Sequence, residues 1–203
     1  MARFTGPKHK MCRRLGEKVC STDKCPLTRR NYPPGVHGVK GRGKLTAFGR
    51  QLREKQKARY IYGLLERQFA NYYKKAIKKT GATDVILLQL LEARFDNVVW
   101  RLGFAKTRAA ARQLVNHGHL QINGKKVDIP SYQVKPGEII NVDPNSLKSS
   151  YFEQLQKNWG KQILQDWLAI DTKELKGQMT VLPKPEQVGL NVDLSLIVEY
   201  YSR

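Results

Sequence analysis

The pattern of hydrophobic and polar positions changes along the chain, and each change predicts a different kind of element. Residues 1–50 show little hydrophobic periodicity and are rich in Gly, Pro, Lys and Arg, so they are not expected to build a core of their own. From about residue 45, apolar residues recur at helical spacing in a basic context and predict an amphipathic helix that ends near Gly63. A second helix is predicted from Leu65 to the stop signal Thr80-Gly81.

A third, more apolar helix is predicted to follow Thr83-Asp84, which can cap its first turn. Its apolar stripe is expected to end before Gly103, which favours a helix C-terminus. The stripe consists of Leu87, Leu91, Phe95, Val98 and Leu102. Thr107 is a good N-cap for a fourth helix that runs to Asn116.

Beyond Gly118 the hydrophobic period changes to two, which is typical of strands. Residues 119–122 and 125–129 flank Asn123-Gly124, a strong signal for a two-residue hairpin turn. Another strand is predicted at residues 138–142. Residues 92–142 therefore predict a compact helix-helix-sheet module.

The last part of the chain has a weaker pattern. It contains a helical stretch near residues 151–159, a loop-rich region and a final apolar strand at residues 196–201. We expect its apolar residues to complete a core begun by the preceding helices. The predicted fold class is α+β, a mostly helical domain plus the small helix-helix-sheet module, with an extended N-terminal segment. The predicted parts are a basic N-terminal segment at 1–45, a helical domain at 46–91 completed by 143–203, and an inserted module at 92–142.

Charge narrows the possible partners. The chain has 203 residues, with 37 Lys+Arg and 17 Asp+Glu, which gives a formal net charge of +20. Such a balance favours a polyanionic partner, either a nucleic acid or an anionic membrane surface. The longest apolar run, residues 85–88, is far too short to span a membrane, and the first residues contain no apolar signal region. We therefore expect no membrane partner and a reducing, cytoplasmic location.

The charge is concentrated at the N-terminal end. Residues 1–80 carry a balance of +18, residues 81–142 a balance of +3, and residues 143–203 a balance of −1. Within the module, Arg108 and Arg112 share one face of the fourth helix, and Lys125-Lys126 follows the hairpin turn. A cationic helix beside a cationic hairpin suits a phosphate backbone and carries no obvious code for bases. The alternative is an ordinary solvated charged face.

Three cysteines and one histidine lie close together near the N-terminus. His9, Cys12, Cys20 and Cys25 provide four ligands that suit one tetrahedral zinc ion. A bound ion would order a segment that has no core. The alternative is three unrelated reduced thiols beside a histidine that contacts phosphate. His37 has no nucleophile or carboxylate beside it, so a phosphate or base contact is expected there rather than catalysis.

Several stretches resemble a known family. Four stretches of the module, residues 91–99, 101–105, 111–119 and 122–124, resemble the small RNA-binding module named after ribosomal small-subunit protein four. Stretches outside the module resemble the same ribosomal protein family in its bacterial or organellar form, and the resemblance covers essentially the whole chain. These stretches are residues 33–38, 51–57, 62–63, 66–69 and 198–203.

The resemblance implies a structural constituent of the small ribosomal subunit that is not an enzyme and has no small-molecule substrate. Such proteins bind small-subunit rRNA directly at a multi-helix junction of its 5′ domain and nucleate assembly. They line the tunnel through which mRNA enters, touch small-subunit ribosomal proteins three and five, and influence decoding accuracy. Some members bind zinc through four cysteines, whereas here His9 takes the first position. The implied location is the small ribosomal subunit, of cytoplasmic or organellar origin.

Two other functions fit some of these features. An RNA-modifying enzyme, such as a pseudouridine synthase, can carry the same module, but it needs a catalytic aspartate in a Gly/Arg-rich signature that this chain lacks. Regulation of its own mRNA or of transcription is compatible with a ribosomal role, and no residue selects it.

The residues expected to contact RNA are mainly basic side chains of the N-terminal half and of the module. They are Arg3, Lys8, Lys10, Arg13, Arg14, Arg29, Arg30, His37, Lys40, Arg42, Lys44, Arg50, Arg53, Lys55, Lys57, Arg59, Arg94, Lys106, Thr107, Arg108, Arg112, His117, His119, Lys125 and Lys126. The stretch from Lys40 to Arg50 is the part that the resemblance assigns to the mRNA tunnel.

Overall fold

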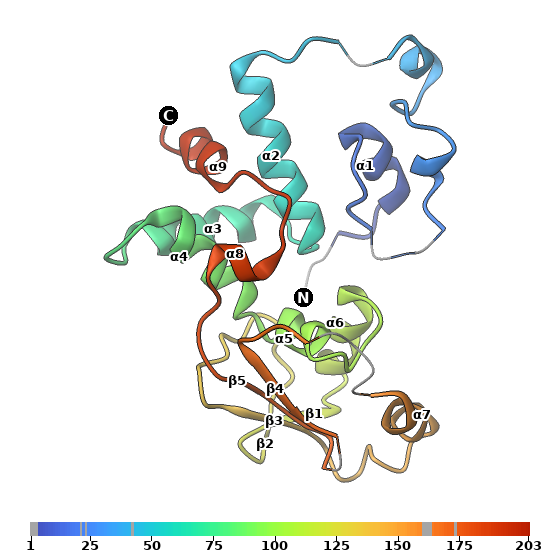
Figure 1. The fold of residues 1–203 in the computed structure, drawn as a ribbon, viewed down its shortest axis with the longest axis vertical. Helices are drawn as coiled ribbons and strands as arrows, with labels where there is room; N and C mark the ends of the chain where they lie inside the picture. Colours follow the sequence, from blue (N-terminus) through green and yellow to red (C-terminus); the bar gives the residue numbers. More distant parts are fainter. Residues whose placement is uncertain (1–3, 21, 23, 42, 160–163, 173) are drawn as a thin grey trace. The chain divides into compact units, whose positions relative to one another are not determined.

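The computed structural model describes residues 4–20, 22, 24–41, 43–159, 164–172 and 174–203. Its helices and five-stranded antiparallel sheet confirm the predicted α+β class (Figure 1). Contacts between residues divide the chain into two units. Unit 1 comprises residues 1–87 and 191–203, and unit 2 comprises residues 88–190. None of the helices in the described ranges is long and apolar enough to cross a membrane.

Unit 1 begins with short helical elements. They are α1 (Lys8–Leu15) and the 3-10 turns η1 (Pro26–Thr28) and η2 (Val36–Lys40). Helix α1 packs against η1, and the buried thiols of this region gather between them. The segment that lacks hydrophobic periodicity therefore forms a small cluster of sulfur atoms in place of a conventional apolar core.

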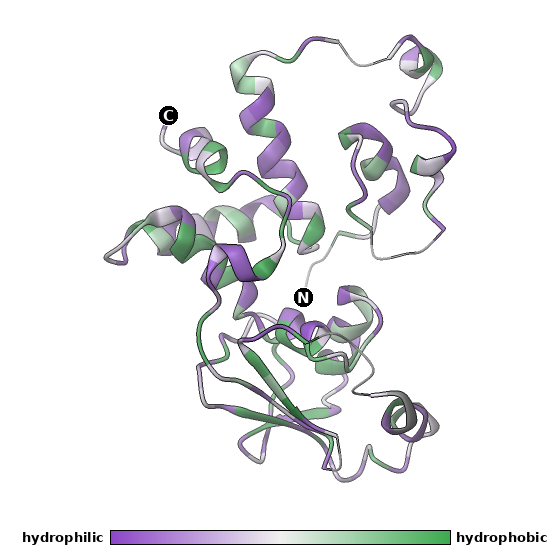
Figure 2. Ribbon diagram, viewed as in Figure 1, coloured by the Kyte–Doolittle hydropathy of each residue, from purple (hydrophilic) through white to green (hydrophobic). Residues whose placement is uncertain are grey.

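The larger part of unit 1 is helical. Helix α2 (Ala47–Ile61) starts at Thr46, whose Oγ1 accepts a hydrogen bond from the Gly49 amide at 3.1 Å. Helix α3 (Glu66–Ile77) follows the turn at Gly63, as predicted. Figure 2 shows that α2 is hydrophilic along most of its length, so its burial depends on a few positions.

The C-terminal residues form a helix, so the predicted strand at residues 196–201 is wrong. Helix α9 (Leu194–Tyr201) packs against α2 (Figure 1). Its N-cap is Asp193, whose Oδ1 accepts hydrogen bonds from the amides of Ser195 and Leu196 at 3.0 and 3.3 Å. A short apolar run fits both periods, and here the cap and the contact with α2 favour the helix.

The predicted third helix is also divided in two. Helix α4 (Thr83–Glu92) contains the boundary between the units, and α5 (Phe95–Arg101) begins after an extended Arg94. The break is stabilised by a distant segment, because the Val134 amide donates to Ala93 O at 2.8 Å and the Phe95 amide donates to Tyr132 O at 2.9 Å. These long-range bonds replace the helical bonds that the local pattern predicts.

The fourth helix and the hairpin confirm the prediction. Helix α6 (Arg108–Asn116) is capped by Thr107, and strands β1 (Leu120–Ile122) and β2 (Lys125–Lys126) pair across the turn. Asn123 and Gly124 both have positive φ, 49° and 77°, as a tight hairpin turn requires.

The sheet extends beyond the predicted module. Its order is β2-β1-β3-β5-β4, with β3 at Ile139–Val142, β4 at Leu168–Asp171 and β5 at Lys176–Met179. The last two strands form an antiparallel pair, and β5 pairs with β3. Sequence reasoning assigned this region to loops, because its alternation is weak and its pairing partner lies far away in the chain.

Residues 143–190 belong to unit 2, so their expected role in completing the helical domain is corrected. They include α7 (Ser150–Asn158) and α8 (Pro185–Val188). The Trp159 indole donates to Leu102 O at 2.7 Å, and Trp167 is fully buried with Met179 in the same core as the module. The pairing of β5 with β3 brings these residues to the module, and α9 is the part of the tail that packs on unit 1.

Candidate nucleic-acid interface

A cationic junction lies where α6 passes into the hairpin in unit 2. Thr107 fixes the start of α6, because its Oγ1 accepts a hydrogen bond from the Ala110 amide at 3.2 Å. Gly118 ends the helix in the left-handed region with a φ of +68°. Lys125, Lys126 and His117 are exposed at this junction, and Lys106 is exposed at the other end of α6, just before Thr107.

Lys126 crosses directly over the end of α6. A Cβ atom placed on Gly118 would lie 3.1 Å from Lys126 Nζ and would clash with Lys126 Cε. Glycine is favoured at this position by its backbone conformation, and a side chain here would also require the flexible end of Lys126 to shift. Lys126 of the hairpin therefore lies beside the loop that carries His117 and His119, as the order of these residues in the sequence predicts.

Arg108 is held in a defined orientation. Its Nε donates to Asn97 Oδ1 at 2.8 Å, and its guanidinium lies 3.7 Å from the centre of the Trp100 ring. The side chain is half-buried. A cation fixed in this way loses less rotamer entropy when it meets an anion.

Two predicted RNA ligands of unit 2 are instead structural. Arg94 and Arg112 are 2% and 7% exposed, and both bind the buried Asp96 carboxylate, at 2.7 and 3.0 Å. A buried guanidinium that is paired in this way is not presented to a phosphate. The sequence contains all three residues, but it does not show that the Asp96 carboxylate lies between the two arginines.

Unit 1 contains the same kind of correction. Lys55 and Lys57 are 3% and 4% exposed. Lys55 Nζ donates to Glu66 at 2.8 Å, and Lys57 pairs with Glu17 at 2.5 Å. Both lysines therefore stabilise unit 1 and are not available on its surface.

Two neighbouring arginines are half-buried on the same helix. Arg59 lies 3.5 Å from Glu66, and Arg53 lies 4.0 Å from Glu17 and also donates to Leu15 O. Their charges are thus partly neutralised within unit 1. Neither is a primary candidate for contact with phosphate.

The remaining predicted cations of unit 1 fall into distinct groups. Arg13 is half-buried and donates to Tyr32 O at 3.1 Å, while Arg3 and Arg42 lie outside the described residues. The exposed predicted residues are Lys8, Lys10, Arg14, Arg29, Arg30, His37, Lys40, Lys44 and Arg50.

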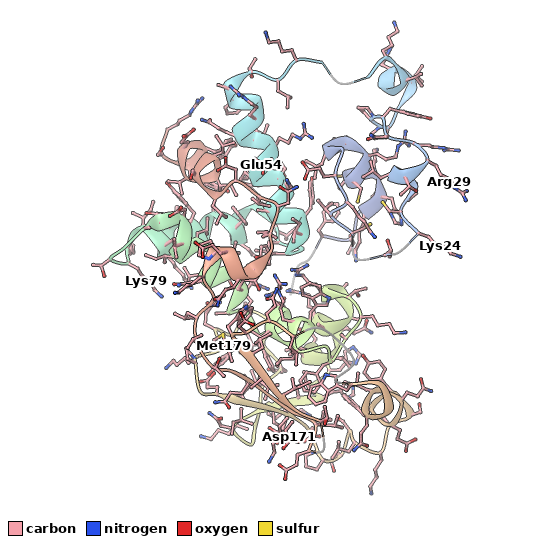
Figure 3. All side chains as sticks on the ribbon, viewed as in Figure 1. Lys24, Arg29, Glu54, Lys79, Asp171 and Met179 are labelled. Carbon is pink, nitrogen blue, oxygen red and sulfur yellow. The ribbon has the colours of Figure 1, made fainter. Side chains whose placement is uncertain are left out.

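Figure 3 shows Lys24 and Arg29 extending away from α1. With Arg30 they are three of the residues that line a hollow of about 580 Å³.

Sequence reasoning missed a further cationic face. Helix α3 and the turn after it expose Arg67, Lys74, Lys75, Lys78 and Lys79, the last of which is labelled in Figure 3. The signal was available, because residues 67, 71, 74 and 78 recur at helical spacing opposite the buried Phe69, Tyr73 and Ala76.

The structure brings three of the four predicted metal ligands together. Ligand atoms of His9, Cys20 and Cys25 all lie within 4.8 Å of one another. Cys12 is fully buried and packs in the same thiol cluster, outside that group of three. The Nδ1 atom of His9 is buried and has no hydrogen-bond partner among the described residues. An orphaned imidazole nitrogen beside thiols fits a zinc ligand.

The thiols of Cys12 and Cys20 differ in pKa. Burial alone would raise the pKa of Cys20, but hydrogen bonds from Thr22, Cys25 and Cys12 lower it to about 6, and the Thr22 hydroxyl lies 3.2 Å from Cys20 Sγ. Burial raises the pKa of Cys12 to about 11. The lowered pKa of Cys20 favours its thiolate, which is the form that binds zinc.

A short helix followed by a hairpin of an antiparallel sheet, with exposed lysines before the helix and in the hairpin, is typical of an RNA-binding module. Residues 93–140 match the family described as "S4 domain". The flanking residues 3–92 match the family described as "Ribosomal protein S4/S9 N-terminal domain". The two matches adjoin, in the order that the resemblance predicts.

Relatives cover the whole chain. It is 48% identical over 209 residues to small ribosomal subunit protein uS4 of Acidobacterium capsulatum, and 49% identical over 210 residues to that of Thermoanaerobacter sp. (strain X514), with 100% of both chains covered in each case. The protein of the same name from Dictyoglomus turgidum is 47% identical over 209 residues, again with full coverage. The chain belongs to the ribosomal protein S4 family, whose members are structural constituents of the small ribosomal subunit and not enzymes.

Proposed function

We propose that the chain binds small-subunit rRNA at a multi-helix junction of the 5′ domain and that it does so early enough to nucleate assembly. The observation that carries this proposal is the presence of exposed cations on both units, from Lys8 and Lys10 near the N-terminus to Lys125 and Lys126 in the hairpin. Cations on separate surfaces suit an RNA that contacts the protein from several sides.

The test is binding to naked RNA. The purified full-length chain and an in vitro transcript of the 5′ domain are mixed without other ribosomal proteins, and affinity is measured by filter binding. We expect tight binding that competitor tRNA does not abolish. Binding that needs the prior addition of other small-subunit proteins would contradict a primary role in assembly.

We further propose that the segment from Lys40 to Arg50 lines the tunnel through which mRNA enters, beside small-subunit proteins three and five. Lys40, Lys44 and Arg50 are exposed, which is what contact with a moving phosphate backbone requires. In assembled subunits, mRNA with a photoreactive uridine downstream of the decoding site is expected to crosslink to this segment. Substitution of Lys44 and Arg50 by Ala is expected to raise misreading in a reporter assay. Crosslinks confined to other proteins would contradict this placement.

We also propose that His9, Cys20 and Cys25 hold one zinc ion, with Cys12 as the fourth ligand. A bound ion would crosslink α1, which carries His9 and Cys12, to the following segment, which carries Cys20 and Cys25, and would order both. Elemental analysis of protein purified without chelator is expected to give one zinc per chain, and Cys20→Ser is expected to lose it. Protein without stoichiometric zinc, with thiols that react freely under native conditions, would support the alternative of separate reduced cysteines.

A further inference from the structure

A hollow of about 270 Å³ lies beside the cationic junction, within unit 2. One wall is formed by α6 through Ala110, Gln113 and Leu114, and the rest is lined by His117, His119 and Tyr151. Drug-sized ligands occupy cavities of roughly 300–1,000 Å³, so this space suits a smaller flat group. The residues that line it comprise two aliphatic side chains, three rings and one amide, with no acidic group among them.

The rings that line the hollow are fixed by contacts behind them. The Tyr151 hydroxyl donates to Phe104 O at 2.6 Å, and its ring packs perpendicular to Phe152 at a centroid distance of 5.2 Å. His119 Nδ1 lies 2.9 Å from Ser146 Oγ. The His117 and His119 rings are nearly parallel, at 17° and 5.9 Å. A preformed aromatic site has less conformational entropy to lose when it binds.

A cation lies beside the loop that carries the two lining histidines. Lys126 crosses Gly118, which stands between the two lining histidines, and Lys125 is exposed beside it in the hairpin. A ligand whose flat part enters the hollow would therefore place an attached anion within reach of these lysines. This combination of rings and adjacent cations matches a nucleotide and does not match an uncharged apolar side chain.

We propose that this hollow binds one unpaired nucleobase of the rRNA, stacked against Tyr151 or the histidines, while Lys126 neutralises its phosphate. The inference rests on the proposed rRNA binding and refines it, because the module would then contact a base as well as the backbone. Gln113 also lines the hollow, and its amide can donate a hydrogen bond to the edge of the base or accept one from it. The base must be unpaired, since a base stacked within an RNA helix cannot enter a hollow in the protein surface.

The first test separates stacking from charge by the salt dependence of affinity. Tyr151→Ala is expected to weaken binding to a 5′-domain transcript by about fivefold to a hundredfold and to leave the slope of log K against log salt unchanged. Lys126→Gln is expected to reduce that slope by roughly 0.7–0.9. Tyr151→Phe keeps the ring and should bind almost as the unaltered chain does. Gln156→Ala, on an exposed position of α7 outside the hollow, is the matched control.

The outcomes distinguish the hollow from rRNA binding in general. If the unaltered chain binds the transcript and Tyr151→Ala binds equally well, the base site is wrong and the proposed function stands. If the unaltered chain does not bind at all, both are wrong. Thermal unfolding of each variant shows whether a loss of affinity comes from a loss of structure.

The second test locates the ligand directly. Ultraviolet irradiation of the complex, followed by nuclease digestion and mass spectrometry, is expected to find a nucleotide adduct on Tyr151, His117 or His119. In assembled subunits, crosslinks from this peptide to a neighbouring protein, without any to RNA, would overturn the proposal.

Discussion

At the scale of single residues, the most consequential side chain of unit 2 is Asp96. Its carboxylate lies between Arg94 and Arg112, and all three groups are buried. The Arg94 Nε also donates to Asp96 Oδ1 at 3.0 Å, so that pair is bidentate. The carboxylate therefore pairs with two buried guanidinium groups at once.

Replacing this carboxylate is expected to destabilise unit 2 strongly. Asp96→Ala removes the carboxylate that pairs with two buried guanidinium groups and should lower the free energy of unfolding by about 3–5 kcal/mol. Urea denaturation monitored by tryptophan fluorescence measures this change. Asp128→Ala removes an exposed carboxylate of the same unit and should change stability by less than about 0.5 kcal/mol. Equal stabilities of the two variants would refute a structural role for the cluster.

In unit 1, Glu66 is likewise a carboxylate that pairs with two cations, Lys55 and Arg59. Its pKa predicts that the stability of unit 1 depends on pH. Burial alone would raise its pKa, but hydrogen bonds from Lys55 and Tyr201, with the charges of Lys55 and Arg59, lower it below the usual 4.5. A lowered pKa in the folded state means that the carboxylate stabilises unit 1 above about pH 4.5. This stabilisation is lost as the pH falls through the folded-state value.

The prediction compares the unaltered chain with Glu66→Gln. Because the side chain is 44% exposed, the difference in unfolding free energy at pH 7 should be about 1 kcal/mol or less. It should shrink as the pH is lowered from 5 to 3. Denaturation curves at several pH values measure it, and a difference that does not change with pH would show that the ion pairs contribute nothing.

At the scale of elements, the turn from α6 into the hairpin depends on Gly118. Gly118→Ala forces a side chain into the left-handed region and into the path of Lys126. We expect a loss of about 1–2 kcal/mol in stability and a weaker affinity for rRNA, because Lys126 must move. Thermal unfolding and filter binding measure the two effects. Gly124→Ala, where nothing lies within 4 Å of the new Cβ, should show the strain without the displaced lysine.

The elements that were predicted correctly carry their signals locally. Thr107 caps α6 and Asn123-Gly124 turns the hairpin through bonds and dihedral angles within a few residues. The elements that were missed depend on distant partners. Strand β5 exists because it pairs with β3, and α4 ends because Ala93 bonds to Val134. A pattern along the chain does not reveal such pairings.

Predictions for the candidate site also succeeded where the signal was local and failed where it depended on distant residues. The cationic junction was predicted because its residues lie close together in the sequence. The buried lysines were misassigned because their partners are distant, as with Lys57 and Glu17. The cations of α3 were missed although their helical spacing was visible. Burial, rather than charge, decides which basic residues can meet a phosphate.

At the scale of the whole molecule, the uneven charge predicts which surfaces set the salt dependence of rRNA binding. Residues 1–80 carry +18, and residues 143–203 carry −1. If the exposed face of α3 contacts phosphate, replacing Lys74, Lys75 and Lys78 by Gln should reduce the slope of log K against log salt by roughly 2 to 3. Replacing the exposed Lys148, Lys176 and Lys184 removes the same total charge from the nearly neutral region. That control should leave the slope unchanged, since long-range attraction alone releases few condensed counterions. Equal changes in both variants would mean that net charge, rather than placed contacts, governs the affinity.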